Sequence, residues 1–363
     1  MKHKIKEYSK KSIFIKVLIS LAIVLILATI YGIYTFYKYK SYDNETMFTE
    51  MDSQLPISIP SIEDTTTYEP LRYGLELSEG EILYDDDIYM YNEAIINILL
   101  IGIDTDVKGL TVQDGVNTGG QADTIIVLTI NTKTNEFEII RVPRDTIAEV
   151  VMLDSDYNYA ATISAPICTA HSYGDGETLS NELMMQAVSR LLYGIPIHRY
   201  LSLNLEAIAD IVDELGGITL EMLDDFTNID SEMEKGKIVT LNGSRAIRYI
   251  RYRKSESGGD DYSSRMPRQL QFMYELYRVI KEKTKDNFTF PLTLMETVKE
   301  NTIHNLSISE ITYLTHLMLE YDLNANKIIT LPGEMVEDFY ITDDEELHKI
   351  IVETFYIPKD NNT

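Results

Sequence analysis

The chain has 363 residues and carries 58 acidic against 32 basic side chains, a formal net charge of −26. This length allows about two domains at ~150 residues each, and the negative charge excludes non-specific binding of nucleic acid. The single cysteine, Cys168, excludes an internal disulfide.

The N-terminal residues differ from the rest in charge and hydropathy. Residues 1–12 form a basic tail, and residues 13–37 contain the uncharged run Val17 to Phe36. A helix of ~20 apolar residues crosses a bilayer, and the run exceeds the ~7–15 apolar residues of a cleaved signal peptide, the alternative interpretation. We therefore predict one transmembrane anchor with a cytoplasmic N-terminus. The rest is expected outside the cell membrane, and the lack of disulfides favours a Gram-positive-type surface.

Residues 38–93 are predicted to form an extracellular stalk. They are acidic, rich in Thr, Ser and Tyr, and interrupted by three prolines, and they show no sustained period of 2 or 3.6. A small accessory fold is the alternative. Residues 94–357 then form the predicted folded domain, and residues 358–363 a C-terminal tail.

The folded domain begins with strand patterns. Ala94 to Asp104 is an apolar, β-branched run, typical of a strand buried on both faces. A second run, Asp123 to Asn131, is joined by a four-residue turn to Glu136–Val142, which is a hairpin pattern.

Helical patterns follow. Apolar residues at helical spacing predict helices over Thr178–Tyr193 and Leu205–Leu215, separated by a short strand, Tyr200 to Asn204. Two glycines end the second helix before another strand, Ile218 to Glu221. The alternation of strands and helices predicts an α/β fold with a mixed central sheet flanked by helices.

Half of the chain's twelve arginines lie between Arg245 and Arg268. Arginine presents a planar fork that holds phosphate oxygens in two places, so this stretch favours phosphate recognition. Surface ion pairs with the abundant Asp and Glu are the alternative. A helix is predicted from about Ser264, with Pro267 in its first turn. Arg265 and Arg268 would then lie at a helix N-terminus, where free amides also favour an anion.

Two carboxylates, Asp104 and Asp123, stand at the ends of apolar strands. Carboxylates near an arginine cluster suit Mg²⁺, which takes one or two carboxylates together with phosphate and water oxygens. Six scattered histidines and one cysteine argue against zinc. Taken alone, either aspartate is better explained as a turn or cap residue than as a metal ligand.

The chain resembles the LytR-CpsA-Psr (LCP) family of cell-wall glycopolymer transferases. The resemblance lies in six segments that occur in the family's order and together run from about residue 95 to 357. They are NILLIGIDTD (97–106), ADTIIVLTINTKTNEFEIIRVPRDT (122–146), the YGDG region (173–176), LLYGIPIHRYLSLNLEAIADIVDELGGITLEM (191–222), LNGSRAIRYIRYRK…RMPRQ (241–269) and LPGEMVEDFYITDDEELHKIIVETFY (331–356).

The resemblance implies a function. It implies that residues 94–357 are a catalytic domain that transfers a phosphoglycosyl polymer, of teichoic acid or capsule type, from a polyprenyl-pyrophosphate lipid to a peptidoglycan hydroxyl. Mg²⁺ or Mn²⁺ would assist, and a pyrophosphatase side activity is a further expectation. By position, the metal ligands and catalytic carboxylates are Asp104 and Asp123, with Arg144 as a third catalytic residue. The residues expected to line the pyrophosphate are Arg144, Arg251, Arg253, Arg265, Arg268 and Gln269.

Three departures from the family pattern leave alternatives open. Asp106 and Gln121 stand where the family usually has arginine, and Asp261 precedes Arg265 by one residue more than usual. A catalytically weakened, regulatory member is one alternative, and an anchored scaffold that binds anionic polymer without chemistry is another. The prenyl chain is expected in an apolar tunnel beside the helices at 178–193 and 205–215, although ordinary core packing explains those residues as well.

Overall fold

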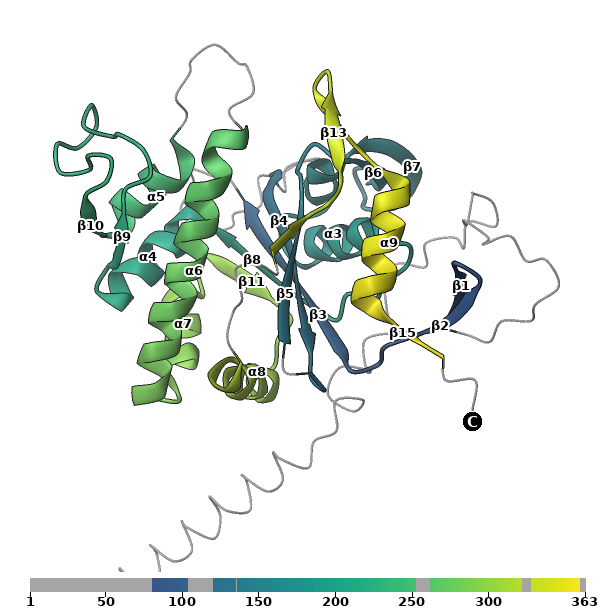
Figure 1. The fold of residues 1–363 in the computed structure, drawn as a ribbon. Helices are drawn as coiled ribbons and strands as arrows, with labels where there is room; N and C mark the ends of the chain where they lie inside the picture. Colours follow the sequence, from purple (N-terminus) through teal and green to yellow (C-terminus); the bar gives the residue numbers. More distant parts are fainter. Residues whose placement is uncertain (1–79, 104–119, 135, 253–261, 322–327, 360–363) are drawn as a thin grey trace, which may run out of the picture. The chain divides into compact units, whose positions relative to one another are not determined.

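The computed structural model describes residues 80–103, 120–134, 136–252, 262–321 and 328–359, and of residues 262–266 only the backbone (Figure 1). They belong to one of the two units into which the chain divides, Phe48–Thr363. The predicted basic tail and anchor lie outside these ranges, as does most of the predicted stalk. Among the described residues, no helix combines the length and the hydropathy needed to cross a bilayer.

A six-stranded mixed sheet forms the centre of this unit, in the order β11-β8-β3-β4-β5-β12. The long strands β3 (Ile95–Ile103), β4 (Ala122–Asn131) and β5 (Glu136–Val142) pair antiparallel. β8 (Arg199–Asn204) runs parallel to β3, and β12 (Ile328–Thr330) runs parallel to β5, while β11 (Thr302–His304) pairs antiparallel with β8. The predicted mixed sheet and the predicted hairpin are therefore confirmed.

Helices cover both faces of the sheet (Figure 1). On one face α3 (Thr178–Leu191) and α9 (Asp344–Phe355) pack their apolar residues into the first core with those of β3, β4 and β5. On the other face, Tyr277 of α6 (Tyr262–Asp286) contacts the ring of Phe137, which points away from the first core. Because β3 is covered on both sides, it is almost entirely buried, as its predominantly apolar sequence predicts.

A second core lies beside the sheet, among α4 (Leu205–Leu215), α5 (Gly243–Arg251), α6 and the hairpin of β9 (Ile218–Glu221) and β10 (Ile238–Leu241). α4 ends as predicted, because Gly216 takes the left-handed conformation at φ +82°. α5 approaches α4 closely at Gly243, where an added Cβ would come within 2.5 Å of the Ala209 carbonyl oxygen. A larger residue there would push α5 away from α4.

Two predictions about element boundaries are wrong. The predicted stalk extended to residue 93, but β1 (Glu81–Tyr84) and β2 (Asp87–Tyr91) form a hairpin, and β2 also pairs with β15 (Tyr356–Pro358). The folded part therefore starts before residue 94, and Pro358 belongs to a strand. The helix predicted from about Ser264 begins at Tyr262, so Pro267 lies inside α6 and beyond its first turn.

The remaining elements connect or flank these layers. They are β6 (Ile147–Leu153), β7 (Tyr159–Pro166), the 3₁₀ helix η2 (Ile167–Tyr173), α7 (Phe290–Val298), α8 (Ile308–Glu320), β13 (Gly333–Val336) and β14 (Phe339–Thr342).

Candidate functional site

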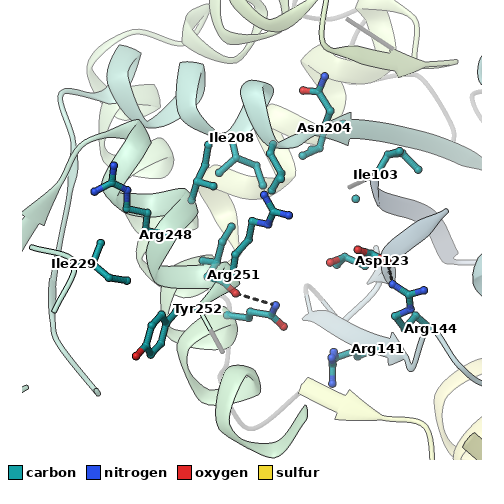
Figure 2. A pocket seen from close by; sticks show the side chains of 17 residues that line it. Ile103, Asp123, Arg141, Arg144, Asn204, Ile208, Ile229, Arg248, Arg251 and Tyr252 are labelled. Carbon is teal, nitrogen blue, oxygen red and sulfur yellow. Dashed lines mark hydrogen bonds and ion pairs between the residues drawn. The ribbon is translucent and has the colours of Figure 1, made fainter. Parts of the chain in front are cut away.

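A pocket of about 550 Å³ opens where the central sheet meets the second core (Figure 2). One wall comes from the ends of β3, β4 and β5, and the other comes from α4, α5 and α6. Its lining residues are Gly102, Ile103, Asp123, Thr124, Arg141, Arg144, Leu203, Asn204, Leu205, Ile208, Ile229, Ile247, Arg248, Ile250, Arg251, Tyr252 and Gln269.

The sheet wall brings together Asp123 and Arg144, two of the predicted site residues. Antiparallel pairing places Ile125 of β4 opposite Val142 of β5, so residues two positions further out on each strand meet at the same end of the sheet. There the Arg144 guanidinium makes an ion pair with the Asp123 carboxylate. Both side chains are only partly buried, at 27% and 30% exposure, so both remain accessible from the pocket.

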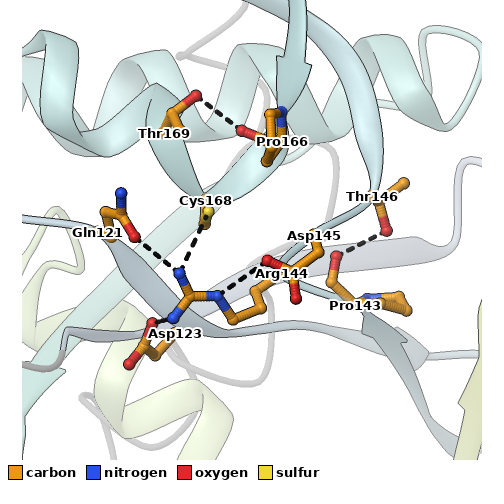
Figure 3. A network of polar contacts seen from close by, with 9 residues as sticks. All are labelled: Gln121, Asp123, Pro143, Arg144, Asp145, Thr146, Pro166, Cys168 and Thr169. Atoms are coloured by element: carbon orange, nitrogen blue, oxygen red, sulfur yellow. Dashed lines mark hydrogen bonds and ion pairs between the residues drawn. The ribbon is translucent and has the colours of Figure 1, made fainter. Parts of the chain in front are cut away.

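Arg144 is held by four neighbours (Figure 3). Besides Asp123, its Nη2 donates to Gln121 Oε1 at 2.7 Å and lies 3.7 Å from Cys168 Sγ, and its Nε donates to Asp145 Oδ1 at 3.3 Å. Gln121 is one of the departures from the family pattern, and here its neutral oxygen accepts a hydrogen bond that an arginine could not accept. Burial raises the pKa of the Cys168 thiol, so this neighbour stays uncharged.

The helix wall is built on α5. Asn242 caps this helix, because its side chain accepts a hydrogen bond from the Arg245 amide at 2.9 Å. Arg245 is bound to Asp230 at 2.8 Å and to Glu232 at 2.5 Å. Arg248 and Arg251 follow at three-residue intervals and line the pocket. The arginine-rich stretch therefore contains both ion-paired and pocket-lining members. The ion-pair interpretation holds for Arg245, and phosphate recognition stays a prediction for Arg251.

Arg268, which was predicted to lie beside the pyrophosphate, is not among the residues that line this pocket. Its side chain is fully buried, and it donates to the carbonyl oxygens of Tyr249 at 2.9 Å and Tyr252 at 2.6 Å. Its Nε lies 3.3 Å from Asp224 Oδ2, and the ring of Phe226 lies 5.3 Å from the guanidinium carbon. Because the two carbonyls end α5, a cation there stabilises the helix C-terminus. Arg268 thus supports the helix that carries Arg251.

Gln269 lines the pocket and also reaches α5. Its Nε2 lies 3.4 Å from the carbonyl oxygen of Ile250. Two residues further along α6, Gln271 accepts a hydrogen bond from the Tyr249 hydroxyl at 2.5 Å. Burial raises the pKa of Tyr249 to about 12, so this hydroxyl keeps its proton at neutral pH. The start of α6 therefore fixes the end of α5 by several contacts.

The pocket also has an apolar part. Its apolar lining residues come from the ends of β3 and β8, from α4 and α5, and from the segment between β9 and β10: Ile103, Leu203, Leu205, Ile208, Ile229, Ile247 and Ile250. By contrast, the inward residues of α3, such as Met184 and Val188, are fully buried in the first core. The apolar residues of α3 therefore pack in the first core, while Leu205 and Ile208 of α4 line the pocket.

Sequence reasoning missed two cations of this pocket, Arg141 and Arg248. A signal for Arg248 was present, because residues three apart on a helix share a face and Arg248 lies three residues before Arg251. No comparable signal marked Arg141, since a cation near the end of a strand is ordinarily solvated.

Several predicted site residues lie outside the described part of the chain. They are Asp104, Arg253 and the side chain of Arg265, and the departures at Asp106 and Asp261 also fall there. Within the described ranges, no cluster of three or more His, Cys, Asp or Glu side chains is placed to hold a metal ion. The oxygen-bearing side chains that line the pocket, Asp123, Thr124, Asn204, Tyr252 and Gln269, offer only hard oxygen ligands, and Asp123 is the one carboxylate among the described lining residues. This donor set fits Mg²⁺ where substrate phosphates complete the coordination.

Comparison with known proteins gives both relatives and similar folds. The chain is 28% identical over 222 residues to the polyisoprenyl-teichoic acid–peptidoglycan teichoic acid transferase TagU of Bacillus subtilis, covering 57% of this chain and 64% of that protein. It is 26% identical over 272 residues to TagU of Oceanobacillus iheyensis, covering 73% and 76%. The chain thus spans less than two thirds of the length of the Bacillus subtilis relative.

The fold is shared with solved structures. The crystal structure of Bacillus subtilis TagV matches with a TM-score of 0.53 at 24% identity, over 72% of this chain and 96% of that one. The pattern of the LytR_cpsA_psr family matches residues 78–354, a range that includes the β1–β2 hairpin. The match covers more than half of the chain and contains the whole pocket, so this protein belongs to the LytR_cpsA_psr family.

Proposed function

We propose that this chain transfers a phosphoglycosyl polymer from a polyprenyl-pyrophosphate lipid to a hydroxyl group of peptidoglycan. The relatives named TagU are transferases of teichoic acid from a polyisoprenyl carrier to peptidoglycan, and a teichoic acid or capsule type of polymer is proposed here by that likeness. The alternatives of a weakened regulator or a binding scaffold are less favoured, because the described part of the site keeps its acid–arginine pair.

One observation carries the proposal. A single pocket holds the Asp123–Arg144 pair on the sheet wall and Arg251 on the facing helix wall (Figure 2), and its lining also contains apolar side chains. Phosphoryl transfer depends mainly on positioning and on neutralising the charge of non-bridging oxygens. Arginines from two walls suit a pyrophosphate, and the apolar surface of α4 suits the first part of a prenyl chain.

The proposed reaction is a phosphoryl transfer to the acceptor hydroxyl. The acceptor hydroxyl oxygen attacks the phosphorus that carries the sugar, and a new P–O bond forms. The P–O bond to the lipid-side phosphate breaks, and polyprenyl phosphate leaves with that electron pair. The hydroxyl proton passes to a carboxylate, for which Asp123 or Asp104 is proposed. Arg144 orients Asp123 through their ion pair, and Arg251 neutralises phosphate oxygens.

We also propose that Mg²⁺ or Mn²⁺ binds through Asp123 and Asp104. When bound, the ion would neutralise pyrophosphate charge and favour departure of the lipid phosphate. The support is the hard-oxygen character of Asp123 and Thr124 in a pocket rich in arginine. The anchoring of the chain by residues 13–37, with its catalytic domain outside the cell membrane, likewise remains a proposal supported by the uncharged run and the basic tail.

The test is transfer from a defined lipid-pyrophosphate donor to peptidoglycan by the full chain in detergent. Asp123→Asn removes the charge but keeps the shape, and we expect a loss of about a hundredfold or more in kcat, the range of general acid–base catalysis. The matched control is Asp156→Asn, in an exposed turn outside the pocket. Activity should also fall with chelator and return with Mg²⁺ or Mn²⁺.

Two outcomes would count against these assignments. Normal turnover by Asp123→Asn, with unchanged thermal unfolding, removes this residue from the chemistry. Full activity of the wild-type chain in excess chelator would contradict the proposed metal requirement but would not contradict the proposed transfer reaction.

A further inference from the structure

The arginines of α5 are not equivalent. Arg245, Arg248 and Arg251 recur at three-residue spacing and so lie near one another along the helix surface. Arg245 is bound to Asp230 and Glu232, and its role is explained by that contact. Arg251 faces Asp123 across the pocket and serves the proposed pyrophosphate site. Arg248 is left without an assigned role.

Arg248 is exposed and lines the pocket. Within the described ranges, no residue makes a hydrogen bond or a salt bridge to its side chain. Asp230 interacts with the Arg248 charge at longer range, but its ion pair is with Arg245. A cation in this position can bind an anionic group of a ligand without first breaking a contact to the protein.

The place of Arg248 indicates which part of a ligand it meets. Figure 2 shows Arg248 beside Ile229 on the side of the pocket away from Asp123 and Arg144, with Arg251 between. Three residues, ~4.5 Å along the axis at 1.5 Å per residue, separate Arg248 from Arg251. Ile229 is 39% exposed, so this end opens to solvent, and a polymer attached to the pyrophosphate must leave the pocket through an open end.

We propose that Arg248 binds an anionic group, a phosphate or a carboxylate, on the first sugars of the donor glycan. This group is separate from the pyrophosphate. Ile229 and the half-buried Tyr252 give this end of the pocket apolar surface against which the carbon face of a sugar ring can pack. The inference rests on the proposed transfer reaction. It adds that the enzyme prefers a donor with a negatively charged glycan and that Arg248, three residues before Arg251, sets this preference.

The experiment compares three synthetic lipid-pyrophosphate donors that differ only in the first sugars: a neutral disaccharide, the same disaccharide with a phosphate, and the same with a carboxylate. The quantity compared is kcat/KM for each charged donor divided by kcat/KM for the neutral one. For the wild-type chain we expect a ratio of about ten for at least one charged donor. Arg248→Gln should lower that ratio about tenfold, because it removes the charge.

Two further variants make the result specific. Arg248→Lys keeps the charge and should retain part of the preference. Arg278→Gln removes an exposed arginine of α6 that is paired with Glu275 at 2.7 Å, and it should keep the wild-type ratio. Raising the salt concentration should reduce the preference of the wild-type chain more than that of Arg248→Gln, because exposed charges are screened.

Failure of this inference is distinct from failure of the proposed function. Turnover of all three donors by the wild-type chain at equal kcat/KM, or an unchanged ratio in Arg248→Gln, overturns the role of Arg248 while the transfer reaction stands. Absence of turnover with every donor counts against the proposed function. In that case the dissociation constants of the same donors test the role of Arg248. Equal dissociation constants for charged and neutral donors would overturn that role.

Discussion

Arg144 on the sheet wall and Arg248 on the helix wall are held in opposite ways. On the sheet wall, Arg144 already contacts Asp123, Gln121 and Asp145. On the helix wall, Arg248 has no hydrogen-bonding or ion-pairing partner within the described ranges. A guanidinium held by protein contacts is preorganised and orients its neighbours, whereas a guanidinium without them is available to neutralise a ligand. In the proposed function, Arg144 would therefore arrange the chemistry, and Arg248 would recognise the charge of the ligand.

A second contrast lies within the arginine-rich stretch itself. Arg268 in α6 is fully buried and bound to backbone carbonyls. Arg251 in α5 is instead exposed in the pocket. The same residue type therefore stabilises the second core at one position and faces the ligand site at another. Three substitutions test these two contrasts.

The largest effect is expected for Arg268→Met, which removes the buried cation. Asp224 would lose its ion-pair partner, and the carbonyl oxygens of Tyr249 and Tyr252 would lose their donor. Removing one partner of a buried ion pair lowers the free energy of unfolding by about 3–5 kcal/mol. We expect the free energy of unfolding in urea to fall by that amount. The control Arg278→Met, at an exposed site of α6, should stay within about 0.5 kcal/mol.

An unchanged free energy of unfolding in Arg268→Met would contradict the structural role. If Arg268→Met instead lost binding of the lipid-pyrophosphate substrate without losing stability, Arg268 would be assigned to the pyrophosphate site, as the sequence predicted.

An intermediate effect is expected for Arg251→Lys. Lysine cannot reproduce the bidentate geometry of a guanidinium on phosphate, and a charge-assisted hydrogen bond contributes about 1.5–3 kcal/mol. We expect binding of a lipid pyrophosphate to weaken about tenfold or more, with thermal stability unchanged. Arg278→Lys is the matched control. Equal binding of the ligand by both variants would remove Arg251 from the phosphate site and would weaken the division between the two walls.

The smallest effect is expected for Gln121→Ala. It removes one acceptor from Arg144 but leaves Asp123 and Asp145 in place. A single hydrogen bond contributes about 0.5–1.5 kcal/mol, so kcat/KM should fall a few-fold while stability stays the same. Steady-state kinetics measure this change. A loss as large as that of Asp123→Asn would mean that Gln121 acts on the substrate directly and does not act by positioning Arg144.

Local sequence patterns determined much of the fold. The apolar runs of β3 and β4, the hairpin to β5 and the amphipathic α4 with its terminal glycines all follow from hydrophobic period and turn chemistry, and the structure confirms them. Asp123 and Arg144 could be predicted as neighbours by position, because antiparallel pairing follows from the hairpin. The order of the six segments identified the family.

Other features depend on contacts between distant parts of the chain. The β1–β2 hairpin was missed because its strands are short and half-exposed and because β15, which completes their sheet, comes from the far end of the sequence. The wall of the pocket formed by Arg248 and Ile229 exists only because α5 and the segment between β9 and β10 fold back against the end of the central sheet.

The arginines show most clearly what the sequence by itself determined and what it left to the tertiary structure. The sequence concentrates cations between Arg245 and Arg268 and spaces them for helices, which predicts an anion site in that region. Which cation is accessible to a ligand is decided by burial: Asp224 and Phe226 enclose Arg268, whereas Arg251 lines the pocket. Burial depends on neighbours that are remote in sequence, so no local pattern can assign it.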